Sequence, residues 1–307
     1  MRVFKNIDEI ELGEKTAVAL GNFDGVHLGH AELIKRTVAF AKERGLASAV
    51  FTFSNHPQNY ILGKTIVPSI TNSSDKEALI AAYDVDYLFS LTFDKSFQTM
   101  SPDSFIEDLV LKSFDAAAVF CGFNFNFGKA ASGNTELLKS ASMSDSFELE
   151  ILPAFMINDN IVSSTLIRDI VSSGNVDRCP VYLGRRFSLS GEVVRDRGNG
   201  RKIGFPTANI LLESDMLAPS SGVYATITVI DGQSHNSVTN VGTRPTIGDG
   251  KMLAESHLFD FSEEIYGEEI KIEFVKKIRN EIKFSGLEEL GAQIAKDKME
   301  ASKILAF

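Results

Sequence analysis

Short apolar runs alternate with longer amphipathic stretches through the first half of the chain. Ala31–Arg44 has helical composition, and Gly45 is the residue expected to end that helix. A further helix is predicted over Ser101–Phe114, with Ser101 as N-cap and Pro102 in its first turn. Strands alternating with helices predict an α/β domain with a parallel sheet. The runs that indicate buried strands are Thr16–Leu20, Ala47–Phe53, Tyr87–Leu91 and Ala116–Phe120.

The pattern changes after about residue 183, where strand-like runs follow one another without helices between them. Turn signals such as Asp231-Gly232 separate the runs, which predicts a small antiparallel β-barrel. Apolar positions over Leu287–Ile304 predict a terminal helix that packs on the barrel. We therefore place one domain at residues 1–183 and a second at residues 184–307. The runs are Phe187–Val194, Val223–Ile230, Ser237–Val241, Ala254–Phe261 and Ile270–Lys276.

Composition narrows the class of protein. The 307 residues are 44% hydrophobic and 23% charged, and no apolar run is long enough to cross a bilayer. Met1–Glu11 has no apolar core of a secretory signal, and Cys121 and Cys179 have no metal-ligand spacing. We expect a cytoplasmic protein, a monomer or a weak homo-oligomer, without membrane contact. A net charge of −10 argues against a nucleic-acid partner, although small phosphates need only a few local cations and amides.

The segment G-N-F-D-G-V-H-L-G-H at residues 21–30 lies where the first strand ends and the first helix begins. A helix start offers unpaired N–H groups that attract an anion, and glycines allow a ligand close to the backbone. His27 and His30 can donate hydrogen bonds to a phosphate. The alternative is an ordinary pair of surface histidines. The candidate phosphate-binding residues here are Gly21, Asn22, Phe23, Gly25 and Gly29.

Three further stretches of the first half offer candidate contacts. His56-Pro57 directly follows the second strand, where α/β sheets place ligands, although a simple strand cap explains it equally well. Alternation over residues 123–127 is expected to put three phenylalanines on one face and two asparagines on the other, which favours a wall for a flat ring or a plain core strand. Ser164 is a good N-cap, and Arg168 lies one turn into the same helix. The candidates are Asn124, Phe125, Phe127, Ser163, Ser164, Thr165 and Arg168.

The second half carries the string G-F-P-T-A-N at residues 204–209. Thr207 and Asn209 share a face of an extended segment, and their side-chain oxygens suit Mg²⁺. The alternative, which is more common for a Thr-x-Asn pair, is a strand with a polar face and no metal ligand. Gly204 begins the string. Arg244 lies in N-V-G-T-R-P-T at residues 240–246, and Glu255 lies in A-E-S-H-L at residues 254–258.

These motifs resemble a known family. The string at residues 21–30 is similar to the H-x-G-H signature of nucleotidylyltransferases, and the whole chain resembles the bacterial bifunctional riboflavin kinase/FMN adenylyltransferases. The resemblance implies a nucleotidylyltransferase-type Rossmann-like domain followed by a riboflavin kinase-like barrel. It implies phosphorylation of riboflavin to FMN and adenylylation of FMN to FAD, with ATP as co-substrate and Mg²⁺ as cofactor.

The resemblance also implies roles for individual residues. His27, His30 and Arg168 are catalytic in adenylyl transfer, and S-S-T-x-I-R at residues 163–168 grips the ATP phosphates. Glu255 is the general base for the riboflavin 5′-hydroxyl. Thr207 and Asn209 hold Mg²⁺, with Gly204 and Thr207 at the ATP phosphates. Flavin contacts fall to His56, Pro57, Asn124, Phe125, Phe127 and Arg244.

Three positions depart from the family pattern. Ser54, Ala131 and Asp196 stand where the family usually has aspartate, arginine and glycine. Ser54 puts the role of an acid at that position in doubt, and Ala131 and Asp196 leave a second hypothesis open, in which one half is a flavin-binding regulatory module without activity. A third hypothesis, adenylylation of another cofactor such as phosphopantetheine, is opposed by the P-T-A-N string.

Overall fold

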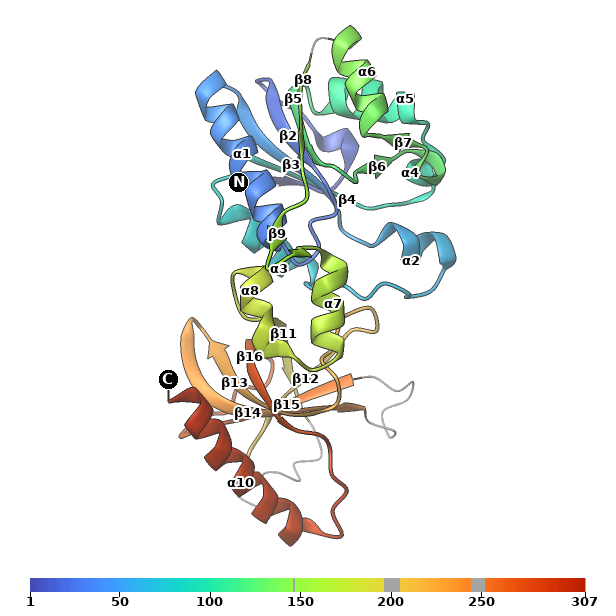
Figure 1. Ribbon diagram of the computed structural model, residues 1–307. Coiled ribbons are helices and arrows are strands. Elements are labelled where there is room, and N and C mark those ends of the chain that lie inside the picture. The colour runs from blue at the N-terminus through green and yellow to red at the C-terminus, as the bar shows by residue number, and fades with distance from the viewer. Residues whose placement is uncertain (146, 196–204, 244–251, 307) are drawn as a thin grey trace. The chain divides into compact units, whose positions relative to one another are not determined.

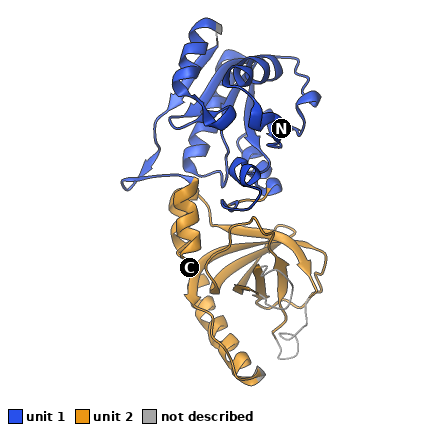
Figure 2. Cartoon of the chain, turned by 90° about the vertical axis from the view of Figure 1, so that its right-hand side faces the viewer, with its two compact units in different colours: residues 1–69, 73–163 blue, residues 70–72, 164–307 orange. Residues whose placement is uncertain are grey.

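The computed structural model describes residues 1–145, 147–195, 205–243 and 252–306 (Figure 1). These residues form two compact units, which are coloured separately in Figure 2. The first comprises Met1–Ser69 and Ser73–Ser163, and the second comprises Ile70–Asn72 and Ser164–Phe307. Compactness thus groups the segment from Ser164 onward with the barrel, and the functional boundary at residue 183 stays a prediction. Within the described residues, no helix has the length and apolar character that a membrane span requires.

The first unit is built on a six-stranded sheet in the order β1-β4-β3-β2-β5-β8, with every neighbouring pair parallel. The predicted parallel α/β architecture is therefore confirmed. Three predicted strands have the bounds given from the sequence, and the fourth extends to Gly122. The strands are β1 (Arg2–Phe4), β2 (Thr16–Leu20), β3 (Ala47–Phe53), β4 (Tyr87–Leu91), β5 (Ala116–Gly122) and β8 (Glu148–Leu152).

Apolar side chains cover both faces of this sheet, because successive residues of a strand point to opposite sides. Val18 and Leu20 of β2 join one cluster with the π-helix Phe105–Ser113, whereas Ala17 and Ala19 join another with α1. Helix α1 ends at Gly45 in the left-handed conformation, as predicted. The other helices are α1 (Leu28–Arg44), α2 (Pro57–Leu62), α3 (Ser73–Ala81), α4 (Lys95–Thr99), α5 (Pro102–Ser104) and α6 (Thr135–Asp145). Short strand pairs are β6 (Asn126–Phe127) with β7 (Gly133–Asn134), and β9 (Met156–Ile157) with β10 (Asn160–Ile161).

The second unit contains a closed barrel in the order β11-β12-β15-β14-β13-β16, with all pairs antiparallel. The predicted barrel is confirmed, and so is the terminal helix, which packs through Ala301, Ile304 and Leu305 against Val223 and Val238. The strands are β11 (Ser188–Val194), β12 (Ala208–Leu211), β13 (Gly222–Ile230), β14 (Gln233–Thr243), β15 (Met252–Leu258) and β16 (Glu269–Arg279). The helices are α7 (Ser164–Ser172), α8 (Cys179–Leu183) and α10 (Leu287–Leu305).

Candidate active sites

The turn between β2 and α1 brings His27 and His30 together. His27 is the N-cap of α1, and its Nδ1 accepts a hydrogen bond from the backbone N–H of His30 at 3.2 Å. Because Nδ1 accepts, the neutral His27 ring carries its proton on Nε2. The two rings stack with centroids 3.6 Å apart and planes 13° from parallel. The sequence-predicted pair therefore forms one structural unit at a helix start.

The backbone of this turn adopts left-handed conformations at one glycine and at two residues that are strained there. Gly25 has φ of 78°, which a glycine adopts without steric cost, and Phe23 and Val26 also have positive φ values of 47° and 36°. A Cβ on Gly29 would lie 3.3 Å from the ring of His27. Gly29 thus allows the His27 ring to lie against the start of α1.

His30 is held neutral at pH 7. Burial, the neighbouring His27 and the buried Lys76 together lower the pKa of His30 well below its usual value. Its Nδ1 atom is shielded from solvent and has no hydrogen-bond partner among the described residues, whereas the side chain as a whole is half-buried. A neutral imidazole that retains some accessible surface can donate one hydrogen bond to a phosphate.

Lys76 is a buried cation that the sequence analysis missed. It lies on α3, is 6% exposed, and donates from Nζ to the Phe53 carbonyl oxygen at 2.6 Å, at the carboxyl end of β3. Burial lowers the pKa of Lys76, and the nearby Asp24 carboxylate acts in the opposite direction. Helix periodicity gives no signal for a buried lysine, since a lysine near a helix start is normally solvated.

His56 and Pro57 lie at the carboxyl end of β3. Pro57 is the first residue of α2, and His56 caps that helix, its Nδ1 accepting from the Gln58 backbone N–H at 3.3 Å. The adjacent Asn55 donates to the Phe93 carbonyl at 2.9 Å and accepts from the Phe93 N–H at 2.7 Å. The capping role considered from the sequence is therefore present, and a flavin contact at His56 remains a prediction.

The expected alternation over residues 123–127 is wrong. Strand β5 ends at Gly122, and a turn closed by the Phe125 N–H and the Gly122 carbonyl at 3.0 Å interrupts the extended chain. Phe123 is consequently 47% exposed, whereas Phe127 is buried. Phe125 and Phe127 still stack with centroids 5.7 Å apart, and Asn124 lies in the turn. Two of the three rings, rather than all three, share one side.

The segment expected to hold the triphosphate begins helix α7. The helix starts at Ser164, so Ser163 precedes it, and the predicted N-cap is shifted by one residue. Thr165 is exposed and Arg168 is half-buried. This helix falls in the second compact unit and the histidines fall in the first, so convergence of these residues on one ligand stays a prediction.

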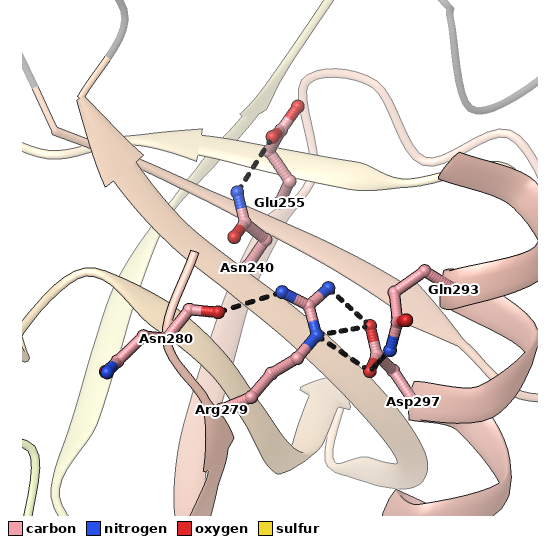
Figure 3. A network of polar contacts seen from close by, with 6 residues as sticks. All are labelled: Asn240, Glu255, Arg279, Asn280, Gln293 and Asp297. Carbon is pink, nitrogen blue, oxygen red and sulfur yellow. Dashed lines mark hydrogen bonds and ion pairs between the residues drawn. The ribbon is translucent and has the colours of Figure 1, made fainter. Parts of the chain in front are cut away.

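A row of polar side chains crosses three strands of the barrel. Strand register places Asn209 of β12 opposite Glu255 of β15, and Glu255 opposite Asn240 of β14. Asn240 donates from Nδ2 to Glu255 Oε2 at 3.4 Å, as Figure 3 shows. Asn209 is 4% exposed, and its Oδ1 has no hydrogen-bond partner among the described residues. Thr207 lies two positions before Asn209, whereas the predicted Gly204 and Arg244 lie outside the described residues.

An ion pair fastens the terminal helix beside this row (Figure 3). Arg279 at the end of β16 contacts Asp297 of α10 through Nη2 at 2.6 Å and through Nε at 2.9 Å. Gln293 donates to the same carboxylate at 2.9 Å, and the Arg279 Nη1 donates to the Asn280 carbonyl. Because Asp297 is almost completely buried, removing either charged partner would leave a costly unpaired charge.

Comparison with known proteins assigns a family to each half of the chain. A family profile described as FAD synthetase matches residues 9–166, and one described as riboflavin kinase matches residues 183–305. A Bacillus subtilis protein is 36% identical over 94% of this chain and 92% of its own length, and a Haemophilus influenzae protein is 37% identical over 92% and 91%. Both relatives are described as bifunctional riboflavin kinase/FMN adenylyltransferase.

A solved structure has the same fold over the whole chain. The crystal structure described as a macrolide-efflux protein from Streptococcus pneumoniae has a TM-score of 0.84, is 29% identical and covers 98% of each chain. The sheet, the barrel and their two motif sets define a two-domain nucleotide-dependent transferase. The family profiles and curated relatives make the assignment specific: the chain belongs to the bifunctional riboflavin kinase/FMN adenylyltransferase family. The resemblance noted from the sequence is confirmed.

Proposed function

We propose that the two activities of this bifunctional enzyme occupy two separate sites, one at the His27–His30 turn and one at the Asn209–Glu255 row. The enzyme phosphorylates riboflavin to FMN and adenylylates FMN to FAD, with ATP as co-substrate in each reaction. The observation that carries the site assignment is the separation of the His27–His30 pair, in the first compact unit, from the Asn209–Glu255 row, in the second.

At the first site, a phosphate oxygen of FMN attacks the α-phosphorus of ATP, and the bond to the departing pyrophosphate breaks. His27 and His30 act as donors to the charge that develops on the phosphates, in a geometry already fixed by their stacking. Arg168 and the amides and hydroxyls of Ser163, Ser164 and Thr165 hold the triphosphate. We assign flavin contacts to His56, Pro57, Asn124, Phe125 and Phe127.

At the second site, Glu255 accepts the proton of the riboflavin 5′-hydroxyl, whose oxygen attacks the γ-phosphorus of ATP as the bond to ADP breaks. The Asn240 amide holds the Glu255 carboxylate in place by the bond at 3.4 Å. We also assign Gly204 to the ATP phosphates and Arg244 to the flavin.

The barrel residues fit a magnesium ion. Asn209 Oδ1 is a buried oxygen without a partner among the described residues, and Thr207 supplies a second oxygen two positions away. Such oxygen ligands are typical of Mg²⁺, which would neutralise charge on the ATP phosphates when bound. The described residues contain no group of three His, Cys, Asp or Glu side chains suited to a metal ion.

Asn209→Ala is expected to raise the Mg²⁺ concentration for half-maximal riboflavin phosphorylation by more than about tenfold, because one ligand oxygen is lost. FAD formation from supplied FMN should keep its wild-type Mg²⁺ dependence. The measurement is the initial rate of each reaction across a Mg²⁺ series at saturating ATP. An unchanged Mg²⁺ dependence of phosphorylation in the variant would contradict the metal assignment.

The remaining assignments concern partners and location. We propose that the enzyme works in the cytoplasm on small molecules, without nucleic-acid or membrane partners, as a monomer or a weak homo-oligomer. The net charge of −10 and two buried free thiols support this proposal. Burial raises the pKa of Cys121 and of Cys179 to about 12, so neither thiol is reactive near neutral pH.

A further inference from the structure

His257 lies in the same strand as Glu255 and on the same face, because it is two positions further along β15. Its Nδ1 lies 2.8 Å from the carbonyl oxygen of Pro206. A carbonyl only accepts, so Nδ1 carries the proton and donates, and Nε2 of the neutral ring is an acceptor. His257 is 8% exposed, and its Nε2 is buried without a partner among the described residues.

The hydrogen bond from His257 to Pro206 holds the segment of the chain just before β12. Pro206 has no N–H, and the strand begins only at Ala208, so the ladder to β15 does not hold the peptide between Pro206 and Thr207. His257 holds it instead. The ring of Phe205, which directly precedes Pro206, meets the same imidazole edge-on, with centroids 5.2 Å apart. One imidazole therefore holds the Pro206–Thr207 peptide at the entry to β12, the strand that carries Asn209.

The strand that carries His257 is itself firmly held. Ser256 points into the barrel and belongs to a closed ring of five buried hydroxyl groups, in which each hydroxyl makes two hydrogen bonds. The bonds are 2.7 to 3.0 Å long, and each hydroxyl can donate once and accept once, so the ring is fully satisfied. The ring joins β13, β14 and β15 through Thr226, Ser237, Thr228, Ser256 and Thr239 in that order.

We propose that His257 is a positioning residue of the kinase site, which holds the Pro206–Thr207 peptide so that Thr207 and Asn209 converge on one Mg²⁺ ion. This inference rests on the metal role proposed above for Thr207 and Asn209. Strand β15 then supplies two functions from one face, the general base at Glu255 and the support for the metal ligands at His257.

The side chain at position 257 is neutral in this role. Burial lowers the pKa of His257, and the positive charge of Lys298 lowers it further, although the Pro206 carbonyl and Asp260 act in the opposite direction. A second proton on Nε2 would place an unpaired N–H in a buried position. An uncharged amide of suitable reach can therefore replace the imidazole, and this gives the test a matched pair of variants.

The test compares His257→Leu with His257→Asn. Leucine fills similar volume without a donor, whereas the asparagine Nδ2 lies close to the former Nδ1 and can still donate to the Pro206 carbonyl. His257→Leu is expected to raise the Mg²⁺ concentration for half-maximal riboflavin phosphorylation and to lower kcat, each by roughly tenfold. His257→Asn is expected to stay within about threefold of wild type, because it keeps the donor.

FAD formation from supplied FMN is measured on the same samples and reports whether the rest of the chain is folded and active. Asn209→Ala is assayed in parallel. A shift with Asn209→Ala but none with His257→Leu would overturn the role of His257 and leave the metal site standing. No shift with either variant would overturn both. Equal impairment of His257→Leu and His257→Asn would also overturn the proposal, because the donor would then be irrelevant.

Discussion

His30→Ala is expected to lower kcat for FAD formation from FMN and ATP by roughly 10²- to 10⁴-fold. The variant removes a neutral donor whose low pKa and stacked position suit it to a phosphate. Riboflavin phosphorylation should remain near the wild-type rate, since the barrel holds its own polar row. Both rates are measured by separating FMN and FAD after reaction, with each flavin substrate supplied in turn.

His235→Ala is the matched control for this prediction. His235 lies on β14 of the barrel, where its ring meets that of Phe261, and it belongs to neither proposed site. The control should retain both activities. If His30→Ala kept FAD formation within about twofold of wild type, or lost both activities equally, the assignment of the first site would be wrong.

Glu255→Gln is expected to have the opposite effect, with a loss of roughly 10²- to 10⁴-fold in riboflavin phosphorylation and wild-type adenylylation of FMN. Glutamine has the same shape, and its side-chain oxygen can still accept the hydrogen bond from Asn240, so the row stays assembled. What the variant lacks is the basic carboxylate that accepts the hydroxyl proton. The initial rate of FMN formation at saturating ATP and Mg²⁺ measures the effect.

Glu269→Gln provides the corresponding control, because Glu269 is an exposed glutamate on β16 of the same barrel. It should phosphorylate riboflavin as wild type does. Wild-type phosphorylation by Glu255→Gln would exclude this residue as the base, whatever the fate of the first activity.

The sequence predicts the architecture well where burial determines the pattern of apolar residues along a strand. The strands Thr16–Leu20 and Ala47–Phe53 are apolar runs buried on both faces, and their bounds follow directly from that burial. Strand β1 was missed, because its three residues bury only Phe4 and are too short to show a period. The prediction of one extended segment over residues 123–127 is wrong, because a turn after Gly122 ends the strand. The sequence still alternates between phenylalanine and asparagine through that turn, so the pattern alone does not reveal it.

The sites are predictable only in part, because a local sequence pattern does not show which distant residues meet in the fold. His27 and His30 are close in sequence, so a helix start suffices to bring them together. Asn209 and Glu255 meet through strand register, which the family motif implies but periodicity does not supply. Lys76 and the Arg279–Asp297 pair depend on burial of charge by tertiary packing, and a single sequence carries no signal for such burial.

The most direct test of the account is the product formed from riboflavin, ATP and Mg²⁺ by an equal mixture of His30→Ala and Glu255→Gln proteins. Each variant alone is expected to make FAD at least about 10²-fold more slowly than wild type, because the first adenylylates FMN poorly and the second forms little FMN. The mixture is expected to make FAD, since FMN released by one protein is adenylylated by the other. A mixture that makes no FAD, although each protein retains its single activity, would contradict two independently working sites.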